Sequence, residues 1–514
     1  MEKLYNNIIM PEIYAPSYPN YVPYIMNPPQ VIDISVGRQL FVDEFLIEET
    51  NLKPEYHMAK KYEGNPVLYP ETSWEKEENA VACPKSGGVW YDEQDKKFKM
   101  WYEATWLKHM CYAESDDGIN WIRPELDIAE GTNKILTYSG YDKYNTFGGN
   151  VNYLRPDSTT VFIDYNCPKD EKYKLFLRNP GGVMPGIVAV SGDGIHFRDF
   201  RLTPDYVEDR STIFYNPFRK KWVYSIRSGW NYRSRRYREC DNYLDGASWN
   251  ENEIKNWMCC DEFDTPNPYI GDKPQLYNVD CVGYESIMLG MFQIMYGPEN
   301  DICEANGVPK ITELMPMYSR DGYNYTRPCR DSIISASMYK GSWDRGYIQS
   351  VGGILIIHDD ELWIYYTGFA GDERYKHVPW VDNGIYMNGA TGIAKLRRDG
   401  FVSMNGTGSL LTRKLEMKGK TNFYVNAKGR VFAEIISEDG NVIAKSNVFD
   451  GDSTKAELIF NGFNINSLNN TVFRLRFNVD GKLYSFGFTD ENGDFGGAHA
   501  AGCYEKDSFK EKRN

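Results

Sequence analysis

Short segments in which apolar and polar residues alternate recur along the chain, and each contains an Asp-Gly pair. AESDDGINWIRPEL (113–126), AVSGDGIHFRDF (189–200) and PMYSRDGYNYTRP (316–328) are close variants of one another. AKLRRDGFVSM (394–404) and YLDGASW (243–249) are looser variants. Alternation is typical of a half-buried strand, and Asp-Gly favours a tight turn because glycine adopts positive φ without steric cost. Each copy therefore predicts a β-hairpin.

A second hairpin precedes most copies of the first. It consists of an apolar strand, a polar turn and another apolar strand, and it occurs in 87–104, 160–178, 212–227 and 352–368. The segment YESIMLGMFQIMYG (284–297) keeps the apolar strand and lacks an obvious turn. Each repeating unit therefore holds two hairpins, or four strands.

Four-stranded units that repeat at more than about 40 residues indicate a β-propeller, because isolated hairpins must pack against their neighbours. The blades are expected at 80–127, 145–203, 207–255, 278–331 and 346–404. A double sandwich is also all-β, but it does not predict the same two-hairpin order five times. We therefore predict an all-β chain with a five-bladed β-propeller followed by a C-terminal β-sandwich.

The pattern also predicts how the chain divides into domains. VFAEIISEDGNVIAKS (431–446) and VFRLRFNVDGKLYSFGF (472–488) are two clean hairpins of different character from the repeats. The expected division is an irregular arm, the propeller with its leading strands, the sandwich and a disordered tail, at residues 1–30, 31–405, 406–505 and 506–514 respectively.

Composition narrows the classes of partner. Aromatic residues make up 15% of the 514 residues, which fits either β-structure or a surface that stacks on sugar rings. The net charge of −14 argues against nucleic acid, which needs a basic surface. The basic run Arg227–Arg238 is read as a solvated strand and loop, or as a clamp for an anionic substrate.

Other classes of site and location lack their usual patterns. The ten cysteines contain no CxxC pair and the six histidines no HExxH, so we expect reduced thiols and no metal site. No nucleotide-binding glycine motif occurs in a strand–helix context, so no cofactor is expected. The N-terminus has no signal-peptide core and no segment is apolar enough to span a bilayer, which predicts a cytoplasmic protein without membrane contact. The oligomeric state stays open.

The S-x-DG-x-x-aromatic hairpins, WYDEQDKKFKMWYEA and NPVLYPETSWE (65–75) resemble the five-bladed propeller glycoside hydrolases. This superfamily includes families 32, 43, 62, 68 and 130, and the added C-terminal sandwich is most similar to family 32. The resemblance implies a carbohydrate-active enzyme with an oligosaccharide substrate. The W-M-N-D-P-N-G, R-D-P and E-C motifs of family 32 are absent, and residues 155–157 read R-P-D, so no catalytic residue is carried over from that family.

Propeller geometry predicts where the chemistry lies. The first strand of each blade starts near the central axis and the second strand returns to the same face, so both ends line one funnel. Glycoside hydrolysis needs two carboxyl groups across the scissile bond. The charged residues at these positions are Glu77, Glu78, Lys85, Glu103, Asp157, Arg178, Glu208, Asp209, Arg210, Arg227, Asp280, Glu285, Asp344 and Arg345.

We expect Glu285 to be the general acid, with Tyr284 beside it, and Asp209 to be the base or nucleophile. We expect Asp344 to be a third catalytic carboxylate that orients the sugar or tunes Glu285. Binding of substrate is assigned to Lys85, Glu103, Arg178, Arg210, Arg227, Trp230 and Tyr284, and further stacking platforms to Trp74, Trp106 and Trp380. Each carboxylate has an alternative role as a structural strand-end group.

The sequence leaves three functions open for this fold. The first is a two-carboxylate glycoside hydrolase. The second is a phosphate-dependent glycoside phosphorylase, for which Lys85, Arg178, Arg210 and Arg227 would supply cations. The third is a non-catalytic carbohydrate-binding propeller.

Overall fold

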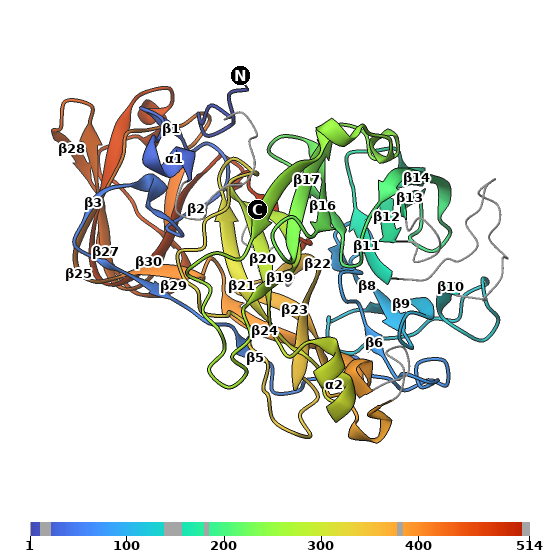
Figure 1. Cartoon of the computed structure of the whole chain (residues 1–514). Helices are drawn as coiled ribbons and strands as arrows, with labels where there is room; N and C mark the ends of the chain where they lie inside the picture. The colour runs from blue at the N-terminus through green and yellow to red at the C-terminus, as the bar shows by residue number, and fades with distance from the viewer. Residues whose placement is uncertain (1, 11–21, 138–156, 179–184, 378–383, 506–514) are drawn as a thin grey trace.

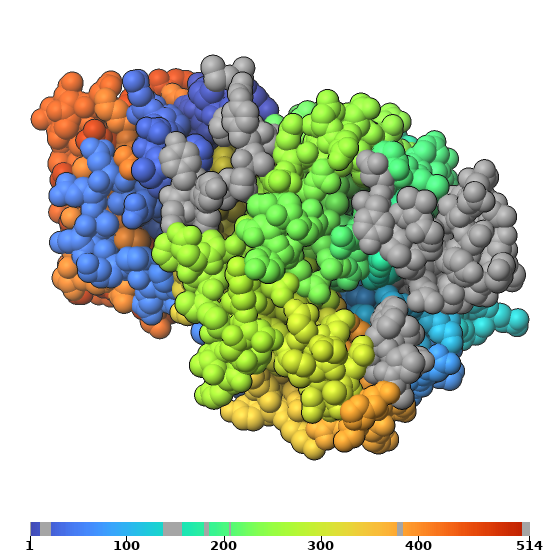
Figure 2. Space-filling view, viewed as in Figure 1, coloured from blue at the N-terminus to red at the C-terminus, as the bar shows by residue number. Residues whose placement is uncertain are grey.

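The structure is a computed structural model that describes residues 2–10, 22–137, 157–178, 185–377 and 384–505. Five small sheets fan out around one axis, and a larger sheet stands beside them (Figure 1). The expected all-β architecture, a five-bladed propeller with a sandwich, is confirmed. Figure 2 shows the two parts in contact along one side of the propeller.

Blades 1 to 3 are antiparallel sheets built from consecutive strands. Blade 1 contains β6 (Ala82–Cys83), β7 (Val89–Asp92), β8 (Lys97–Ala104), β9 (His109–Ser115) and β10 (Lys134–Thr137). Blade 2 contains β11 (Asp157–Ile163), β12 (Tyr173–Arg178), β13 (Pro185–Ser191) and β14 (Arg198–Tyr206). Blade 3 contains β15 (Thr212–Asn216), β16 (Lys221–Ser228), β17 (Ser234–Cys240) and β18 (Lys255–Cys259).

Blades 4 and 5 also recruit strands from distant parts of the chain. Blade 4 contains β19 (Gln275–Glu285), β20 (Ile287–Gly297), β21 (Ile311–Ser319) and β31 (Ala498–His499). Blade 5 contains β22 (Gly346–His358), β23 (Glu361–Phe369), β24 (Gly389–Arg397), β5 (Lys60–Lys61) and β32 (Cys503–Tyr504). Because β5 precedes blade 1 in sequence and pairs with β24 of the last blade, it helps to close the ring.

The repeated Ser-x-Asp-Gly segments form one recurring turn. In blade 1, the Gly118 N–H donates to Oγ of Ser115, and the Ile119 N–H donates to a carboxylate oxygen of Asp117. The same bonds recur around Asp193 and Asp321. The side chains satisfy the turn's backbone donors, which explains why this pattern recurs at hairpin ends.

The second domain is one ten-stranded sheet folded around an apolar core. Its strands are β1 (Ile32–Asp33), β2 (Gln39–Leu40), β3 (Ile47–Thr50), β4 (Lys53–Tyr56), β25 (Val402–Thr412), β26 (Leu415–Glu416), β27 (Asn422–Ser437), β28 (Val442–Lys445), β29 (Phe449–Glu457) and β30 (Phe473–Thr489). Gly429 and Gly481 face each other on the two longest strands, each with positive φ. A Cβ on either glycine would meet the opposite backbone, so only glycine allows this close approach.

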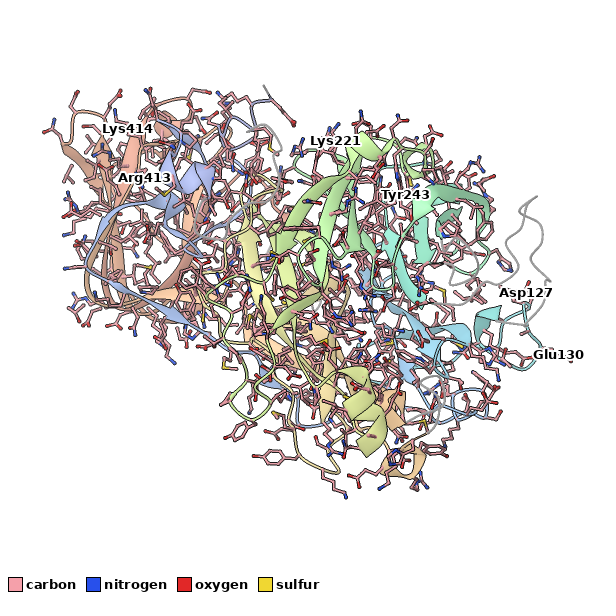
Figure 3. The ribbon with its side chains drawn as sticks, viewed as in Figure 1. Asp127, Glu130, Lys221, Tyr243, Arg413 and Lys414 are labelled. Atoms are coloured by element: carbon pink, nitrogen blue, oxygen red, sulfur yellow. The ribbon has the colours of Figure 1, made fainter. Side chains whose placement is uncertain are left out.

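The N-terminal strands differ from the expected division. Residues 31–56 were assigned to the propeller, but β1 to β4 pair with β26, β30 and β25 of the sandwich. These pairings join residues at least 346 positions apart, and a local sequence pattern does not encode them. Helices are short, as in α1 (Pro23–Met26) and α2 (Asn300–Asn306). Charged residues such as Asp127 and Glu130 project outward from the blades (Figure 3).

Candidate functional site

The ends at which the inner strands begin share a strained backbone. Lys85, Ser158, Arg210 and Tyr347 lie at these ends in blades 1, 2, 3 and 5, with φ of 49°, 54°, 63° and 50°. Left-handed backbone costs about 1–3 kcal/mol for such residues and concentrates at functional sites. The strand register shifts at two of these positions, in β11 and in β22. We call this end of the axis the mouth; its charged residues are Lys85, Glu103, Asp157, Arg178, Glu208, Asp209, Arg210, Arg227, Arg233, Arg235, Asp280 and Lys310.

Lys85 holds two carboxyl groups from different blades. Its Nζ lies 2.8 Å from Oε2 of Glu103 and 3.9 Å from Oδ1 of Asp157, and all three side chains are buried. The two carboxyl oxygens are therefore at most about 7 Å apart, an upper limit that is compatible with the separations found in glycosidases. Both carboxyl groups come from positions that adjoin the mouth, at the end of β8 and the start of β11.

The environments of these two carboxyl groups differ. Burial raises the pKa of Glu103 above its ordinary value, in spite of Lys85. Burial also acts to raise the pKa of Asp157, but Lys85 and Arg178 overcome it and hold the pKa below its ordinary value. Two carboxyls with pKa values moved in opposite directions are suited to opposite roles in proton transfer.

Blade 3 supplies the most exposed carboxylates of the mouth. Arg227 forms an ion pair with Asp209, and its Nε lies 3.2 Å from a carboxylate oxygen of Glu208. The side chains of Asp209 and Glu208 are 32% and 33% exposed. Both can therefore meet a ligand that enters the mouth.

The axis is closed by polar groups from several blades. Asp280 of β19 accepts a hydrogen bond from Asn278 Nδ2 at 2.9 Å and another from the Ser350 hydroxyl. Arg210 donates from Nη2 to Oγ of Ser86 over 3.1 Å. Burial raises the pKa of Asp280 above its ordinary value.

An aromatic wall lies beside these charges. Trp106 stacks on Tyr386 with ring centroids 4.0 Å apart, and Nζ of Lys85 lies 4.0 Å from the centroid of Trp106. The hydroxyls of Tyr277 and Tyr347 are 3.0 Å apart, and Lys310 Nζ donates to Tyr277 over 3.2 Å. All four rings are buried, so they form packed aromatic support behind the charged residues.

The structure separates Glu285 from Asp209. Asp209 lies just before β15 begins. Gly283, two residues before Glu285, packs against Pro217, which lies just after β15 ends. Glu285 lies close to the sandwich, where it accepts from the Arg38 N–H at 3.1 Å and pairs with Arg398 at 3.4 Å. The expected acid–base pair of Asp209 and Glu285 therefore does not form.

Two further expected residues also lie away from the mouth. Tyr284 donates its hydroxyl to Asp399 over 2.5 Å, close to the sandwich. Asp344 accepts from Lys61 Nζ at 2.6 Å and from the Tyr366 hydroxyl at 3.1 Å, and Lys61 belongs to the outer strand β5. Both are polar partners in the packing of blades.

The other expected binding residues lie at the mouth. Lys85, Glu103, Arg178, Arg210 and Arg227 form the contacts given above. Trp230 follows β16 and donates Nε1 to the carbonyl of Arg235 over 3.2 Å. Trp380 lies outside the described residues.

The sequence does not single out Tyr277 and Lys310, whereas Arg233 and Arg235 lie in the basic run 227–238, for which a clamp on an anionic substrate is one of two interpretations. Tyr277, Lys310, Arg233 and Arg235 come from strands or loops whose distance from the axis is set by the propeller alone. The alternation of β17 was the available signal, because it directs every second side chain to one face of the strand.

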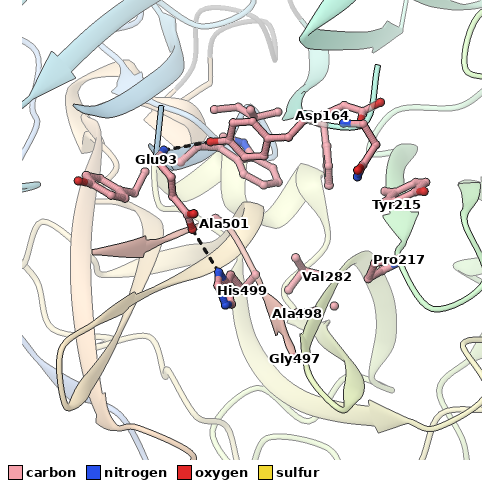
Figure 4. A pocket seen from close by; sticks show the side chains of 18 residues that line it. Glu93, Asp164, Tyr215, Pro217, Val282, Gly497, Ala498, His499 and Ala501 are labelled. Carbon is pink, nitrogen blue, oxygen red and sulfur yellow. Dashed lines mark hydrogen bonds and ion pairs between the residues drawn. The ribbon is translucent and has the colours of Figure 1, made fainter. Parts of the chain in front are cut away.

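A separate hollow of about 270 Å³ lies at the far end of the propeller (Figure 4). Aromatic residues such as Tyr215 line it, and Glu93 and His499 pair across it at 3.3 Å. A larger hollow of about 630 Å³ adjoins it and includes Glu285 and Arg38. Neither includes the residues that define the mouth.

Among the described residues, we find no cluster of three or more His, Cys, Asp or Glu side chains able to hold a metal ion. The helices in the same part of the chain are all too short or too polar to cross a membrane.

Comparisons with known proteins give distant similarities. No family model matches the sequence. It is 23% identical over 216 residues to Invertase 2 of Saccharomyces cerevisiae, a match that covers 38% of this chain and only 37% of the invertase.

Two solved structures illustrate the structural similarity. An N-acetylgalactosamine deacetylase from F. plautii aligns with a TM-score of 0.42 and 14% identity, over 68% of this chain and 96% of that one. A beta-1,2-mannobiose phosphorylase from Listeria innocua aligns with a TM-score of 0.42 and 11% identity, over 66% and 96% of the two chains.

Proposed function

We propose that the protein is a glycoside hydrolase that cleaves an oligosaccharide at the mouth of its propeller. The observation that carries this proposal is the pair of carboxyl groups on either side of Lys85. Oxygens of Glu103 and Asp157 are at most about 7 Å apart, which is compatible with a glycosidase pair, and their pKa values are moved in opposite directions.

In this mechanism Glu103 is the proton donor and Asp157 the ionised partner. Glu103 transfers its proton to the glycosidic oxygen as the bond from that oxygen to the anomeric carbon breaks. Asp157 accepts a proton from water while the water oxygen bonds to the anomeric carbon, or it bonds to that carbon itself and is later released by water. Either route yields two free sugars.

Other residues of the mouth have supporting roles in this proposal. Asp209 is exposed and paired with Arg227, so it is placed to hydrogen-bond sugar hydroxyls. Trp106 and Tyr386 stack on each other and are buried, so they support Lys85 from behind rather than meeting the sugar. The Lys85 ammonium keeps Asp157 ionised.

The test is a release assay on aryl glycosides and oligosaccharides, with and without inorganic phosphate. Wild type is expected to hydrolyse at least one substrate without phosphate. Glu103→Gln and Asp157→Asn should each lower kcat by about 10²–10⁴-fold while the fold is kept. Asp241→Asn is the control, because Asp241 is exposed, directly follows β17 and contacts Lys221 rather than any residue of the mouth. Full activity of both mouth variants contradicts the mechanism, and a wild type inactive on every substrate contradicts the function.

A further inference from the structure

Three arginines at the mouth lack an acidic partner. Arg210, Arg233 and Arg235 have no carboxylate within 4.0 Å among the residues that the structure describes, whereas Lys85, Arg178 and Arg227 are each paired with acids. The whole chain carries a net charge of −14, so the local excess of positive charge at the mouth is opposite in sign to the net charge of the protein.

Arg210 has, within the described residues, more buried donor atoms without a hydrogen-bond partner than either of the other two arginines. It is 2% exposed, and its Nη2 donates to Ser86. Within the described part of the chain, neither its Nε nor its Nη1 has a hydrogen-bond partner. These enclosed donors leave the charge of Arg210 uncompensated, so it adds to the positive potential of the mouth.

Arg235 and Arg233 extend the positive region. Arg235 is fully buried and donates to the carbonyl oxygens of Arg210 and Tyr277, which carry no net charge. The guanidinium carbon of Arg233 lies 5.1 Å from the ring centroid of Tyr277, and this side chain is partly exposed. Arg233 is therefore the cation of the three that an entering ligand can reach.

The pKa values of Arg235 and Tyr277 are shifted in the directions that an excess of positive charge produces. Burial, followed by repulsion from Arg227 and Arg210, moves the pKa of Arg235 well below its ordinary value. Burial acts to raise the pKa of Tyr277, but Lys310 and Arg233 outweigh it and lower that pKa to about 7. An ionised phenol is favoured only where positive charge is in excess.

We infer that the mouth binds a substrate through an oxyanion, either the carboxylate of an acidic sugar or a phosphate, held by Arg233, with the buried Arg210 and Arg235 adding positive potential behind it. The inference rests on the proposed function, because it names the chemical class of the ligand at the same site. Planar guanidinium groups present paired donors that match both oxyanions, and excluding water strengthens the interaction. A neutral sugar would leave this positive charge uncompensated.

Calorimetric binding to the full chain tests this inference. The ligands are glucuronate and galacturonate, the matching neutral hexoses, and inorganic phosphate, each measured at low and high sodium chloride. A hexuronate or phosphate is expected to bind more tightly than the neutral hexoses, with affinity that falls as salt increases. Stronger binding of the hexuronate assigns the oxyanion to the sugar, and stronger binding of phosphate assigns it to the free ion.

Two matched variants locate the interaction. Arg233→Gln should weaken oxyanion binding by about tenfold, the loss of one charge-assisted hydrogen bond. Arg236→Gln also removes one positive charge. Arg236 directly follows Arg235 in β17, so its side chain points to the opposite face of the strand, and this variant should bind like wild type. Equal binding of hexuronates, phosphate and neutral hexoses overturns the inference, as does an equal effect of the two variants.

The outcomes separate this inference from the proposed function. Cleavage of neutral glycosides with no preference for an oxyanion contradicts the inference alone. Selective oxyanion binding by a protein that cleaves no glycoside in the panel contradicts the hydrolase function alone.

Discussion

Nζ of Lys85 lies 2.8 Å from a carboxyl oxygen of Glu103, and the two side chains are 2% and 4% exposed. Removing one partner of such a pair leaves a buried charge without compensation, which costs about 3–5 kcal/mol. Lys85→Met should therefore lower the free energy of unfolding by about this amount, measured by chemical denaturation. The double variant Lys85→Met, Glu103→Gln should recover part of the loss. A Lys85→Met protein as stable as wild type would show that the pair is not buried as described.

A second prediction concerns Glu285, whose carboxylate binds Arg38 and Arg398 close to the sandwich. Glu285→Gln should lower the free energy of unfolding by about 1–3 kcal/mol, because it weakens buried charged hydrogen bonds. Its kcat should stay close to that of wild type, whereas Asp157→Asn loses turnover. Steady-state kinetics and denaturation of both variants check this. If Glu285→Gln folds stably and is inactive, the acid expected from the sequence is correct after all.

The misplacement of Glu285 has a physical origin in blade 4. The sequence pattern predicts the first strand within the apolar segment 284–297, which puts Glu285 just before it. The structure has β19, Gln275–Glu285, as the inner strand. Its polar residues Asn278 and Asp280 face the axis, so the inner strand is not continuously apolar.

Other parts of the site were predictable for the same geometric reason. Lys85, Arg178 and Arg227 were found because they lie just before the first strand or at the end of the second, and these ends converge at the mouth. The hairpin pattern likewise predicted the propeller, since its turns are local. The pairing of β1 to β4 with the sandwich depends on contacts between opposite ends of the chain, which local periodicity does not encode.

Tyr277 gives a third prediction, because Lys310 and Arg233 outweigh the effect of burial and lower its pKa to about 7. Absorbance of the phenolate should therefore show one tyrosine that titrates near neutral pH in wild type and is missing in Tyr277→Phe. The folded pKa lies below the ordinary value, so this group stabilises the fold fully above about pH 10 and loses its contribution as pH falls through 7. The stability difference between wild type and Tyr277→Phe should accordingly grow from pH 6 to pH 9. Identical titration curves for the two proteins would exclude an ionised Tyr277.

The fourth prediction concerns Asp399, whose Asp-Gly turn joins the propeller to the sandwich. Its carboxylate accepts from Nη1 of Arg38 at 3.0 Å and from the hydroxyl of Ser485, a residue of β30, at 2.6 Å. Burial acts to raise the pKa of Asp399, but Arg38 and Arg398 hold it below its ordinary value. Asp399→Asn should lower the free energy of unfolding by about 3–5 kcal/mol at neutral pH, because Arg38 is left buried without its counter-charge.

The pH dependence of the Asp399 variant follows from the sign of that shift. A carboxyl group whose pKa is lowered in the folded state stabilises the fold fully at pH values above its ordinary pKa, near 4. This contribution is lost as the pH falls through the folded pKa. The stability difference between wild type and Asp399→Asn should therefore be largest at neutral pH and shrink in acid. Calorimetry should also show the variant unfolding in two steps, because the two domains share this contact. Asp117→Asn, in the exposed turn of blade 1, is the matched control and should keep a single transition. A difference that is constant from pH 7 to pH 3 would mean that Asp399 is not ionised in the folded protein.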